Sequence, residues 1–447
     1  MRPPPSTPKC CREGRRLRVV MIDPGAFTPF HDDALCRALA GQGCEVELIT
    51  SPFVYHPWPA AVGYTRREEF AGGAGAGEGS GTGRRGLRRL RRALSYPLIW
   101  RRLARELARR PPEIVHLQWS LLPAVERRAL SRLRAAGVVV VQTVHNARPH
   151  RGEPSLLPAG AVLLEAVDAW VTLSQATAGR LVAAHPALAG RVRVIPPGLE
   201  TSARAAPGQA GEPAEATDGR ARANARAVAR ARLGLEAEAP LALFVGLIRP
   251  YKGLDLLLAA FAGVLRGLPE ARLVVAGLPR PSFRPYARQI EHLGLGERVR
   301  TDLRYLPQSV MDDYLAAADL VVLPYREASQ SAVLGAALAA DRPVVASATG
   351  GLAEMFAGAT EELLVPAGDV AALEVAMRRL LGDRRTAAEL GRRAGEAARQ
   401  RFSWAGSAAA TAELYRELAA AGGTIGTSGT SGGRGSDPAE AHGVRTS

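Results

Sequence analysis

The sequence predicts an α/β protein with two doubly wound, Rossmann-like lobes, and two observations lead to this fold class. Short β-branched runs alternate with amphipathic helical stretches from residue 17 to about 200, and the same alternation resumes from about 240 to 400. This alternation is typical of parallel sheets with crossover helices. The length of 447 residues, with 47% hydrophobic and 23% charged residues, is typical of a globular chain with two or three domains.

The first lobe is expected to span residues 16–200, after a disordered basic tail at 1–15. A Gly-rich tract at 71–83 interrupts this lobe and has the composition of a flexible insert. Six short runs rich in β-branched and apolar residues are the expected strands: 17–23, 44–50, 113–119, 138–144, 168–174 and 191–196.

The second lobe is expected to span residues 226–401, after a low-complexity linker or insert at 203–225 that is rich in Pro, Gly and Ala. A helix is expected at 402–421, and the Gly- and Ser-rich tail at 422–447 is expected to be disordered. The expected strands of this lobe follow the same pattern as those of the first: 241–247, 271–277, 299–302, 319–324 and 343–347.

The formal net charge of +15 indicates a polyanionic partner, which is a nucleic acid, an anionic membrane surface or a phosphorylated small molecule. A nucleic acid is the least favoured of these classes. The sequence shows no recognisable nucleic-acid-binding module, its arginines are spread through helices, and aromatic residues make up only 5% of the chain.

Three features of the sequence favour the cytoplasm. The amino terminus has no apolar run of signal-peptide length, and no stretch reaches the roughly 18–20 apolar residues of a membrane-spanning helix. The four cysteines, Cys10, Cys11, Cys36 and Cys44, lack the CxxC spacing of a metal site, and we interpret them as unpaired thiols in a reducing compartment. We therefore expect a cytoplasmic protein without a metal site.

A strongly basic amphipathic helix is predicted at 84–110, with Pro97 breaking or kinking it midway. One interpretation is a surface that attracts anionic lipid headgroups or a lipid-linked substrate. The other is a crossover helix that packs its apolar stripe on its own sheet, and the position of the helix slightly favours this one. The stripe consists of leucines three to five residues apart: Leu87, Leu90, Leu94, Leu98, Leu103 and Leu107.

The stretch GLIRPYKG, residues 246–253, holds one of only two lysines in the chain, the other being Lys9. Arg249 and Lys252 stand here on a loop between an apolar strand and an amphipathic helix, at the carboxyl edge of a parallel sheet, where ligands bind in open α/β folds. A guanidinium and a compact ammonium beside Gly246 suit a diphosphate group. We interpret Lys252 as a residue that approaches phosphate where the wider arginine would clash.

At this point the chain resembles glycosyltransferase family 4, the retaining nucleotide-sugar transferases of GT-B fold. Over 240–381 the resemblance lies in GLIRPYKG, ARLVVAG, AADLVVLPYRE, RPVVASATGGLAEM and LLVPAGD. Over 16–200 it is weaker and lies in DPGAFTPFHDDALCRALAGQGCEVELIT, EIVHLQW, TVHN and VIPPGL. The resemblance implies two lobes that face each other across a cleft, with the helix at 402–421 returning to the first lobe.

The resemblance also implies roles for individual residues. Arg249 and Lys252 match the basic pair that contacts the diphosphate of the sugar donor, and His145 in TVHN matches the histidine that faces the donor sugar. Asn146 is a weaker companion of His145. On the acceptor side, Pro24 and Gly25 match the glycine turn that follows the first strand.

The sequence departs from the family where two glutamates, with seven residues between them, orient the donor sugar and hold the ribose. Their positions fall on Ala328 and Ala336, and we expect Glu327 to supply the sugar contact from one residue away. The segment that follows can still bind the sugar donor, because the backbone amides at the start of a helix favour a phosphate group. We expect three residues of this segment to bind the sugar donor there: Gln330, Ser331 and Ala332.

Three further residues are assigned to the sugar-donor site. Gly350 and Gly351 form a tight turn before a helix, which is consistent with close approach of the backbone to a ligand, although an ordinary loop explains them equally well. Glu354 matches a family glutamate near the nucleotide, but a solvated carboxylate in a first helical turn explains it almost as well.

The function that the resemblance implies is a retaining, metal-independent transfer of a hexose-type sugar from a nucleoside diphosphate sugar to a hydroxyl group. The acceptor is expected to be a glycan or a lipid-linked molecule, with peripheral contact between 84–110 and the inner face of an anionic membrane. No cofactor is expected. The alternatives are a catalytically inactive protein that binds nucleotide sugars, a GT-B epimerase and, least favoured, a nucleic-acid-binding protein.

Overall fold

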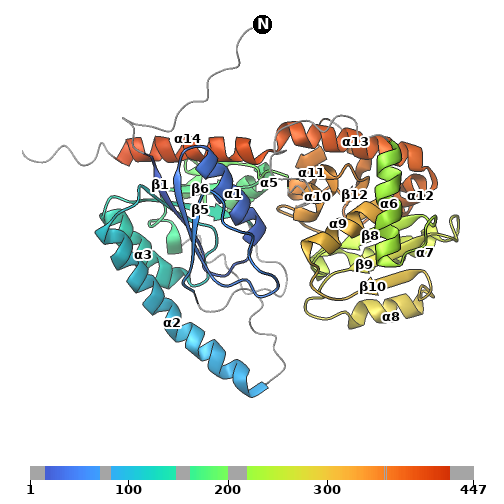
Figure 1. The fold of residues 1–447 in the computed structure, drawn as a ribbon, viewed down its shortest axis with the longest axis horizontal. Helices are drawn as coiled ribbons and strands as arrows, with labels where there is room; N and C mark the ends of the chain where they lie inside the picture. Colours follow the sequence, from blue (N-terminus) through green and yellow to red (C-terminus); the bar gives the residue numbers. More distant parts are fainter. Residues whose placement is uncertain are drawn as a thin grey trace, which may run out of the picture.

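The computed structural model describes residues 16–70, 82–146, 162–199, 219–356, 358 and 360–422. The predicted tail at 1–15, most of the insert at 71–83, most of the linker at 203–225 and all of the tail beyond residue 422 lie outside the described residues. The described chain forms two α/β lobes, each built on one parallel sheet (Figure 1). The predicted fold class is confirmed.

The first sheet has seven parallel strands in the order β3-β2-β1-β4-β5-β6-β7. All six predicted strands of this lobe are present. The seventh, β3, was missed because its sequence TRRE has no apolar run; it lies at the edge of the sheet, where its polar side chains stay partly exposed. The strands are β1 (Arg18–Asp23), β2 (Glu45–Thr50), β3 (Thr65–Glu68), β4 (Ile114–Leu117), β5 (Val139–Val144), β6 (Ala169–Thr172) and β7 (Val192–Val194).

Helices cover both faces of this sheet, and the alternation of side chains along β1 shows how. Val20 and Ile22 pack into a core with α2 and α3, whereas Val19 and Met21 pack on the other face with α1 and α14. The final helix of the chain thus belongs to the core of the first lobe (Figure 1). The helices are α1 (Pro29–Gly41), α2 (Thr82–Arg109), α3 (Pro123–Ala135), α5 (Gln175–Ala184) and α14 (Trp404–Gly422).

The second sheet has six parallel strands in the order β10-β9-β8-β11-β12-β13. The strand order reverses at β8, which lies between β9 and β11, so the topological switch point is the carboxyl end of β8. The five predicted strands are present, and the two-residue β13 was not foreseen. The strands are β8 (Leu241–Val245), β9 (Arg272–Ala276), β10 (Val299–Asp302), β11 (Leu320–Leu323), β12 (Val344–Ser347) and β13 (Leu364–Val365).

Amphipathic helices enclose this second sheet around one large apolar core. Two of them, α12 and α7, pack against each other, as do α6 and α9. The helices are α6 (Gly219–Leu233), α7 (Leu254–Val264), α8 (Arg284–His292), α9 (Gln308–Ala317), α10 (Ala332–Ala339), α11 (Gly350–Phe356), α12 (Val370–Gly382) and α13 (Arg384–Arg401).

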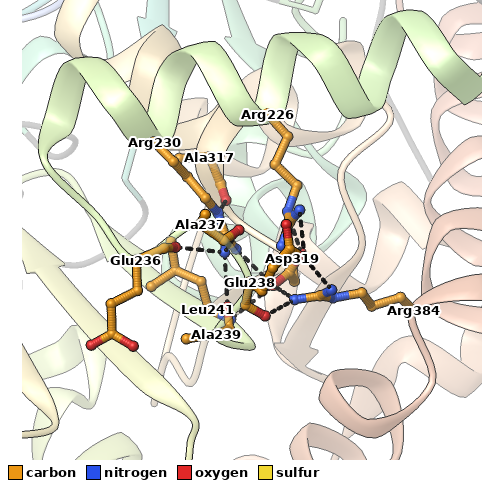
Figure 2. A network of polar contacts seen from close by, with 10 residues as sticks. All are labelled: Arg226, Arg230, Glu236, Ala237, Glu238, Ala239, Leu241, Ala317, Asp319 and Arg384. Carbon is orange, nitrogen blue, oxygen red and sulfur yellow. Dashed lines mark hydrogen bonds and ion pairs between the residues drawn. The ribbon is translucent and has the colours of Figure 1, made fainter.

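Helix α6 corrects one prediction. Residues 219–225 were expected to belong to a linker, but they form the first two turns of this helix, because the Ala- and Arg-rich sequence from Gly219 has high helix propensity. Arg230, whose side chain is 1% exposed, attaches α6 to the rest of the second lobe. Figure 2 shows its guanidinium between α6 and the amino end of β8, donating to Asp319 and to the carbonyl oxygens of Ala317, Glu236, Ala237 and Ala239.

The chain crosses from the second lobe back to the first through α14. Tyr415 in this helix lies in the first-lobe core, and its hydroxyl is 2.6 Å from Nδ1 of His116. Near the crossing, Gly198 lies against the start of α14, because a Cβ at Gly198 would come within 2.4 Å of the Trp404 nitrogen. No helix in the described part of the chain has the length and hydropathy needed to cross a bilayer.

Candidate functional site

The loop at the carboxyl end of β8 places Arg249 and Lys252 at the switch point of the second sheet. Pro250–Lys252 form a single 3-10 turn, which ends at Gly253 with φ +69°. A side chain at Gly253 would be strained there, and its Cβ would approach the Pro324 carbonyl oxygen to 2.1 Å. The glycine therefore lets the loop pack tightly on the end of β11 before α7 begins.

Lys252 is almost completely buried, with 8% of its surface exposed. Its ammonium lies 5.3 Å from the ring centroid of Tyr325, and among the described residues no carboxylate forms an ion pair with it. Burial lowers the pKa of Lys252, and the charge of Arg249 lowers it further. A buried cation without a carboxylate partner is costly, so an anionic ligand here would relieve that cost.

The Lys252 ammonium lies close to the backbone of Gly246. Gly246 has φ +101°, and a Cβ built there would lie 3.4 Å from the Lys252 Nζ and 3.1 Å from Val333. A side chain at position 246 would therefore contact the ammonium, and the absence of one leaves the ammonium beside the Gly246 backbone. Arg249 is half-buried at the other end of the loop, and burial lowers the pKa of its guanidinium.

The predicted helix start forms as expected in α10. Ser331 is its N-cap, with its hydroxyl accepting from the Leu334 amide at 3.2 Å, and Ala332 is the exposed first residue. The Gln330 side chain instead reaches the first lobe, where its amide donates to the carbonyl oxygen of Leu173 at 2.7 Å. Gln330 therefore joins the two lobes in this structure.

The positions of the two missing family glutamates carry buried methyl groups, because Ala328 is 2% exposed and Ala336 is 7% exposed. Glu327 is half-buried and lies near enough to Tyr251 to contribute to raising the pKa of that hydroxyl, after the larger effect of burial. The expectation that Glu327 contacts the sugar stays a prediction.

Contacts within the protein explain the two glycines at the start of α11. A Cβ at Gly350 would lie 1.8 Å from the Ala328 carbonyl oxygen, and one at Gly351 would lie 2.0 Å from the Ser329 carbonyl oxygen. The Gly351 amide also donates to Ala328. Contact with a neighbouring loop therefore requires these glycines, whereas the sequence interpretation offered contact with a ligand or an ordinary loop.

Glu354 is half-buried, and it is not the solvated carboxylate that the sequence also allowed. Both its oxygens accept hydrogen bonds from the first lobe, from the amides of Gln175 at 2.8 Å and Ala176 at 2.6 Å. These amides lie at the start of α5, where the helix dipole favours a negative charge. Glu354 thus joins the lobes, and no local sequence signal could reveal a pairing across almost 180 residues. Its place near the nucleotide stays a prediction.

His145 follows β5 and is enclosed by aromatic rings. It stacks on Trp119 with the centroids 4.6 Å apart and the planes 4° from parallel, and the edge of His31 lies 5.2 Å away. Its Nε2 is 3.2 Å from Oε1 of Gln118, so Nε2 carries the hydrogen and Nδ1 is free to accept one. Burial lowers the pKa of His145 well below 6.5, which makes the ring neutral at pH 7.

The acceptor-side turn after β1 is held by a buried carboxylate that the sequence interpretation did not single out. Asp23 accepts from the amides of Gly25 at 3.0 Å and Phe27 at 2.8 Å, while the Pro24 carbonyl oxygen accepts from Ser51 at 2.7 Å. A Cβ at Gly25 would collide with the Phe27 ring at 2.1 Å. The predicted turn therefore exists, and the aspartate at the end of the strand was the available signal.

Two more first-lobe residues, Asn146 and Trp119, belong to the surroundings of His145. Asn146 is half-buried and directly follows His145, which is consistent with its predicted place. Trp119 was missed, although it follows β4 as His145 follows β5. Its indole donates to the Thr28 hydroxyl at 3.0 Å, and this bond orients the ring on which His145 stacks.

Comparison with known families gives two matches. The model described as Glycosyltransferase Family 4 matches residues 33–203, and the model described as Glycosyl transferases group 1 matches residues 239–383. The two matches fall on the first and the second lobe respectively.

Among curated proteins, the chain is 35% identical over 282 residues to a D-inositol 3-phosphate glycosyltransferase of Kineococcus radiotolerans, covering 58% of this chain and 60% of that protein. It is 33% identical over 303 residues to a protein of the same name from Salinispora arenicola, covering 64% and 65%. The chain thus spans less than two thirds of the length of these relatives.

Among solved structures, the sucrose-phosphate synthase from Thermosynechococcus elongatus has a TM-score of 0.65 at 22% identity, covering 91% of this chain and 100% of that one. Anabaena HepE in complex with UDP-glucose has a TM-score of 0.64 at 16% identity, covering 90% and 100%. These likenesses confirm the GT-B fold that the sequence predicts.

Proposed function

The chain belongs to the family 4, group 1 glycosyl transferases, and on this premise we propose that it transfers a hexose-type sugar from a nucleoside diphosphate sugar to a hydroxyl group. The observation that carries the proposal is Lys252, a buried ammonium without an ion pair among the described residues, beside Arg249 at the switch point of the second sheet. A diphosphate group would supply the negative charge that this buried cation favours. The complexes of Anabaena HepE with UDP and with UDP-glucose support a nucleotide sugar as the donor.

The proposed catalysis is electrostatic. Arg249, Lys252 and the start of α10 stabilise the charge that develops on the leaving diphosphate. A neutral His145 holds a hydroxyl of the donor sugar through Nδ1 and keeps the sugar in position. The proposed reaction retains the configuration of the sugar, with the leaving phosphate taking the proton of the acceptor, and it needs no metal or other cofactor.

The nucleotide is identified by a panel of UDP, GDP and ADP sugars in a thermal-shift assay. We expect one nucleotide class to raise the melting temperature, since a ligand that binds only the folded state stabilises it. The shift should persist with EDTA and should be lost in Lys252→Ala. A shift that EDTA abolishes would contradict the metal-independent site, and no shift for any sugar would contradict the proposed function.

One alternative function is supported by a specific observation. In this alternative, the protein binds a nucleotide sugar without transferring it. The support is the pair of buried methyl groups, Ala328 and Ala336, at the positions of the family glutamates. The two functions differ in turnover. Release of free nucleotide, or transfer of the sugar from a radiolabelled donor to an acceptor extract, favours the transferase; donor binding without either result favours the binding protein.

We further propose that the acceptor is reached at an anionic membrane through α2. Of the predicted apolar stripe, Leu103 and Leu107 lie in the first-lobe core. Leu98 lies instead on an exposed and basic face, where it is 65% exposed beside four arginines. Contact with the inner face of a membrane would therefore be electrostatic. The arginines are Arg101, Arg102, Arg105 and Arg109.

Cosedimentation with vesicles tests this surface. Vesicles containing phosphatidylglycerol should bind the protein at low salt, whereas pure phosphatidylcholine vesicles should not, and binding should fall as salt rises. The double substitution Arg101→Glu/Arg105→Glu should abolish binding. The matched control is Arg284→Glu/Arg288→Glu, which makes the same charge change on exposed positions of α8. Equal loss in both variants would mean that net charge, not α2, governs binding.

A further inference from the structure

The loop after β11 is attached to the loop that carries the basic pair. Strands β8 and β11 are neighbours in the second sheet, so both loops leave the sheet at the same edge. The Arg326 amide donates to the Tyr251 carbonyl oxygen at 2.8 Å, and the Arg326 guanidinium donates to the Pro250 carbonyl oxygen at 3.1 Å. The residue after Tyr325 is thus bonded to the two residues before Lys252.

Tyr325 is buried where these two loops meet, with 2% of its surface exposed. Its ring contacts Tyr251 nearly at right angles, with the centroids 6.0 Å apart and the planes at 81°. The Lys252 ammonium lies over the Tyr325 ring, 5.3 Å from its centroid. A buried cation therefore lies against the face of a buried aromatic ring whose position is fixed by its neighbours.

The face of an aromatic ring attracts a cation, and the attraction is stronger where water is excluded. Burial, the largest effect, and the charge of Arg249 lower the pKa of Lys252, whereas Tyr251 raises it. A carboxylate in place of the ring would favour the ammonium too, but its charge would repel a diphosphate. The neutral Tyr325 ring favours the charged lysine and leaves its positive charge available to an anionic ligand.

We propose that Tyr325 is a positioning residue, whose ring face holds the charged Lys252 ammonium at the site of the donor diphosphate. The proposal rests on the proposed function and deepens it, because it assigns the group that keeps this site cationic. The role belongs to the ring and not to the hydroxyl, which is near the Ser331 side chain at the start of α10. Without the ring, the ammonium should lose its proton at a lower pH.

Nuclear magnetic resonance can follow the charge of Lys252 directly, because the chain has only two lysines. In the full chain labelled with ¹³C-lysine, the Cε signal of Lys252 is assigned with Lys252→Met and titrated, with Lys9 as the internal reference. Tyr325→Leu should move the midpoint of this titration down by about one pH unit, as for a cation–π interaction in a desolvated site. Tyr325→Phe keeps the ring and should leave the midpoint in place.

Tyr314→Leu is the matched control, since it removes another buried tyrosine from the same apolar core, on α9. It should leave the Lys252 midpoint in place, and melting temperatures check that every variant is folded. An equal shift in Tyr314→Leu would assign the effect to loosened packing, and an equal shift in Tyr325→Phe would assign it to the hydroxyl. Either result would overturn the inference, as would an unchanged midpoint in Tyr325→Leu.

Titration calorimetry with UDP, GDP and ADP separates this inference from the proposed function. For the diphosphate that binds best, Tyr325→Leu should weaken binding by up to about tenfold at alkaline pH, the ratio that corresponds to one pH unit, and by less at neutral pH. Affinity for the corresponding nucleoside, which has no phosphate, should change little. An equal loss of nucleoside affinity would overturn the inference.

Two further outcomes distinguish the two proposals. If the wild type binds a diphosphate and Lys252→Met does not, but the Lys252 midpoint is the same in Tyr325→Leu, the inference is wrong and the proposed function stands. If the wild type binds none of the three nucleotides while Tyr325→Leu still lowers the midpoint, the proposed function is wrong and the hold of the ring on Lys252 stands.

Discussion

Lys252→Ala is expected to lower kcat/KM for the sugar donor by about 10²- to 10³-fold, the usual loss when one preorganised electrostatic contact to a developing charge is removed. The ammonium is buried beside the Gly246 backbone and close to Arg249, where a diphosphate would replace the solvation it lacks. Lys252→Arg should restore little activity, because a planar guanidinium presents its donors in a wider fork than a compact ammonium and Lys252 is almost completely buried. Steady-state kinetics of both variants would check this.

The free energy of unfolding provides the control measurement for the Lys252 variants. The folded protein lowers the pKa of this group, so the charged form is less favourable in the folded than in the unfolded state at neutral pH. Removing it with Lys252→Met should therefore leave the free energy of unfolding unchanged or increase it, while activity falls. The same shift predicts that donor binding weakens at an alkaline pH below the ordinary 10.5 of lysine, as the ammonium is deprotonated. Normal turnover in Lys252→Met would refute the electrostatic role.

Arg230→Met is expected to decrease the free energy of unfolding of the second lobe by about 3–5 kcal/mol, because four buried or partly buried carbonyl oxygens lose their donor, while Asp319 keeps Arg226 at 3.0 Å. The substitution leaves Asp319 buried and takes the donor away from four carbonyl oxygens that connect α6 to the start of β8 and the end of α9 (Figure 2). Denaturant unfolding followed by circular dichroism would measure the loss.

The matched control for Arg230 lies two residues away on the same helix. Arg232 forms an ion pair with Asp313 at 3.3 Å, but its side chain is 49% exposed. Exposed pairs contribute about 0–1 kcal/mol, so Arg232→Met should change stability by no more than that. Similar losses of stability in the two variants would show that any loss of charge on α6 destabilises the protein. The buried hydrogen bonds of Arg230 would then contribute no more than the exposed ion pair of Arg232.

The order of strands and helices and the place of the basic pair could be predicted from the sequence because they depend on local patterns. A run such as LALFV is buried on both faces of a parallel sheet, and the following GLIRPYKG loop must then leave the carboxyl end of that strand. The same reasoning failed for β3, whose charged residues carry no such pattern, and for 219–225, where low complexity was taken for a linker although alanine and arginine favour helix.

The partners of individual side chains could not be predicted in this way. Glu354 was placed by its neighbours in sequence, yet its oxygens bind amides of the first lobe, and Gly350 and Gly351 face a loop about twenty residues earlier in the chain. Tyr55 gave no signal because its partners, Arg280 and Tyr305, lie more than 200 residues later. Each of these contacts exists only once the lobes have formed and met.

The sequence by itself determined two Rossmann-like lobes and the position of Arg249 and Lys252 at a strand end, because hydrophobic periodicity and loop composition act over a few residues. Only the tertiary structure decided that Lys252 is buried beside Gly246 and that Glu354 and Gln330 join the lobes. Burial and long-range pairing depend on how distant segments pack, and the cost of an unpaired charge is set by that packing.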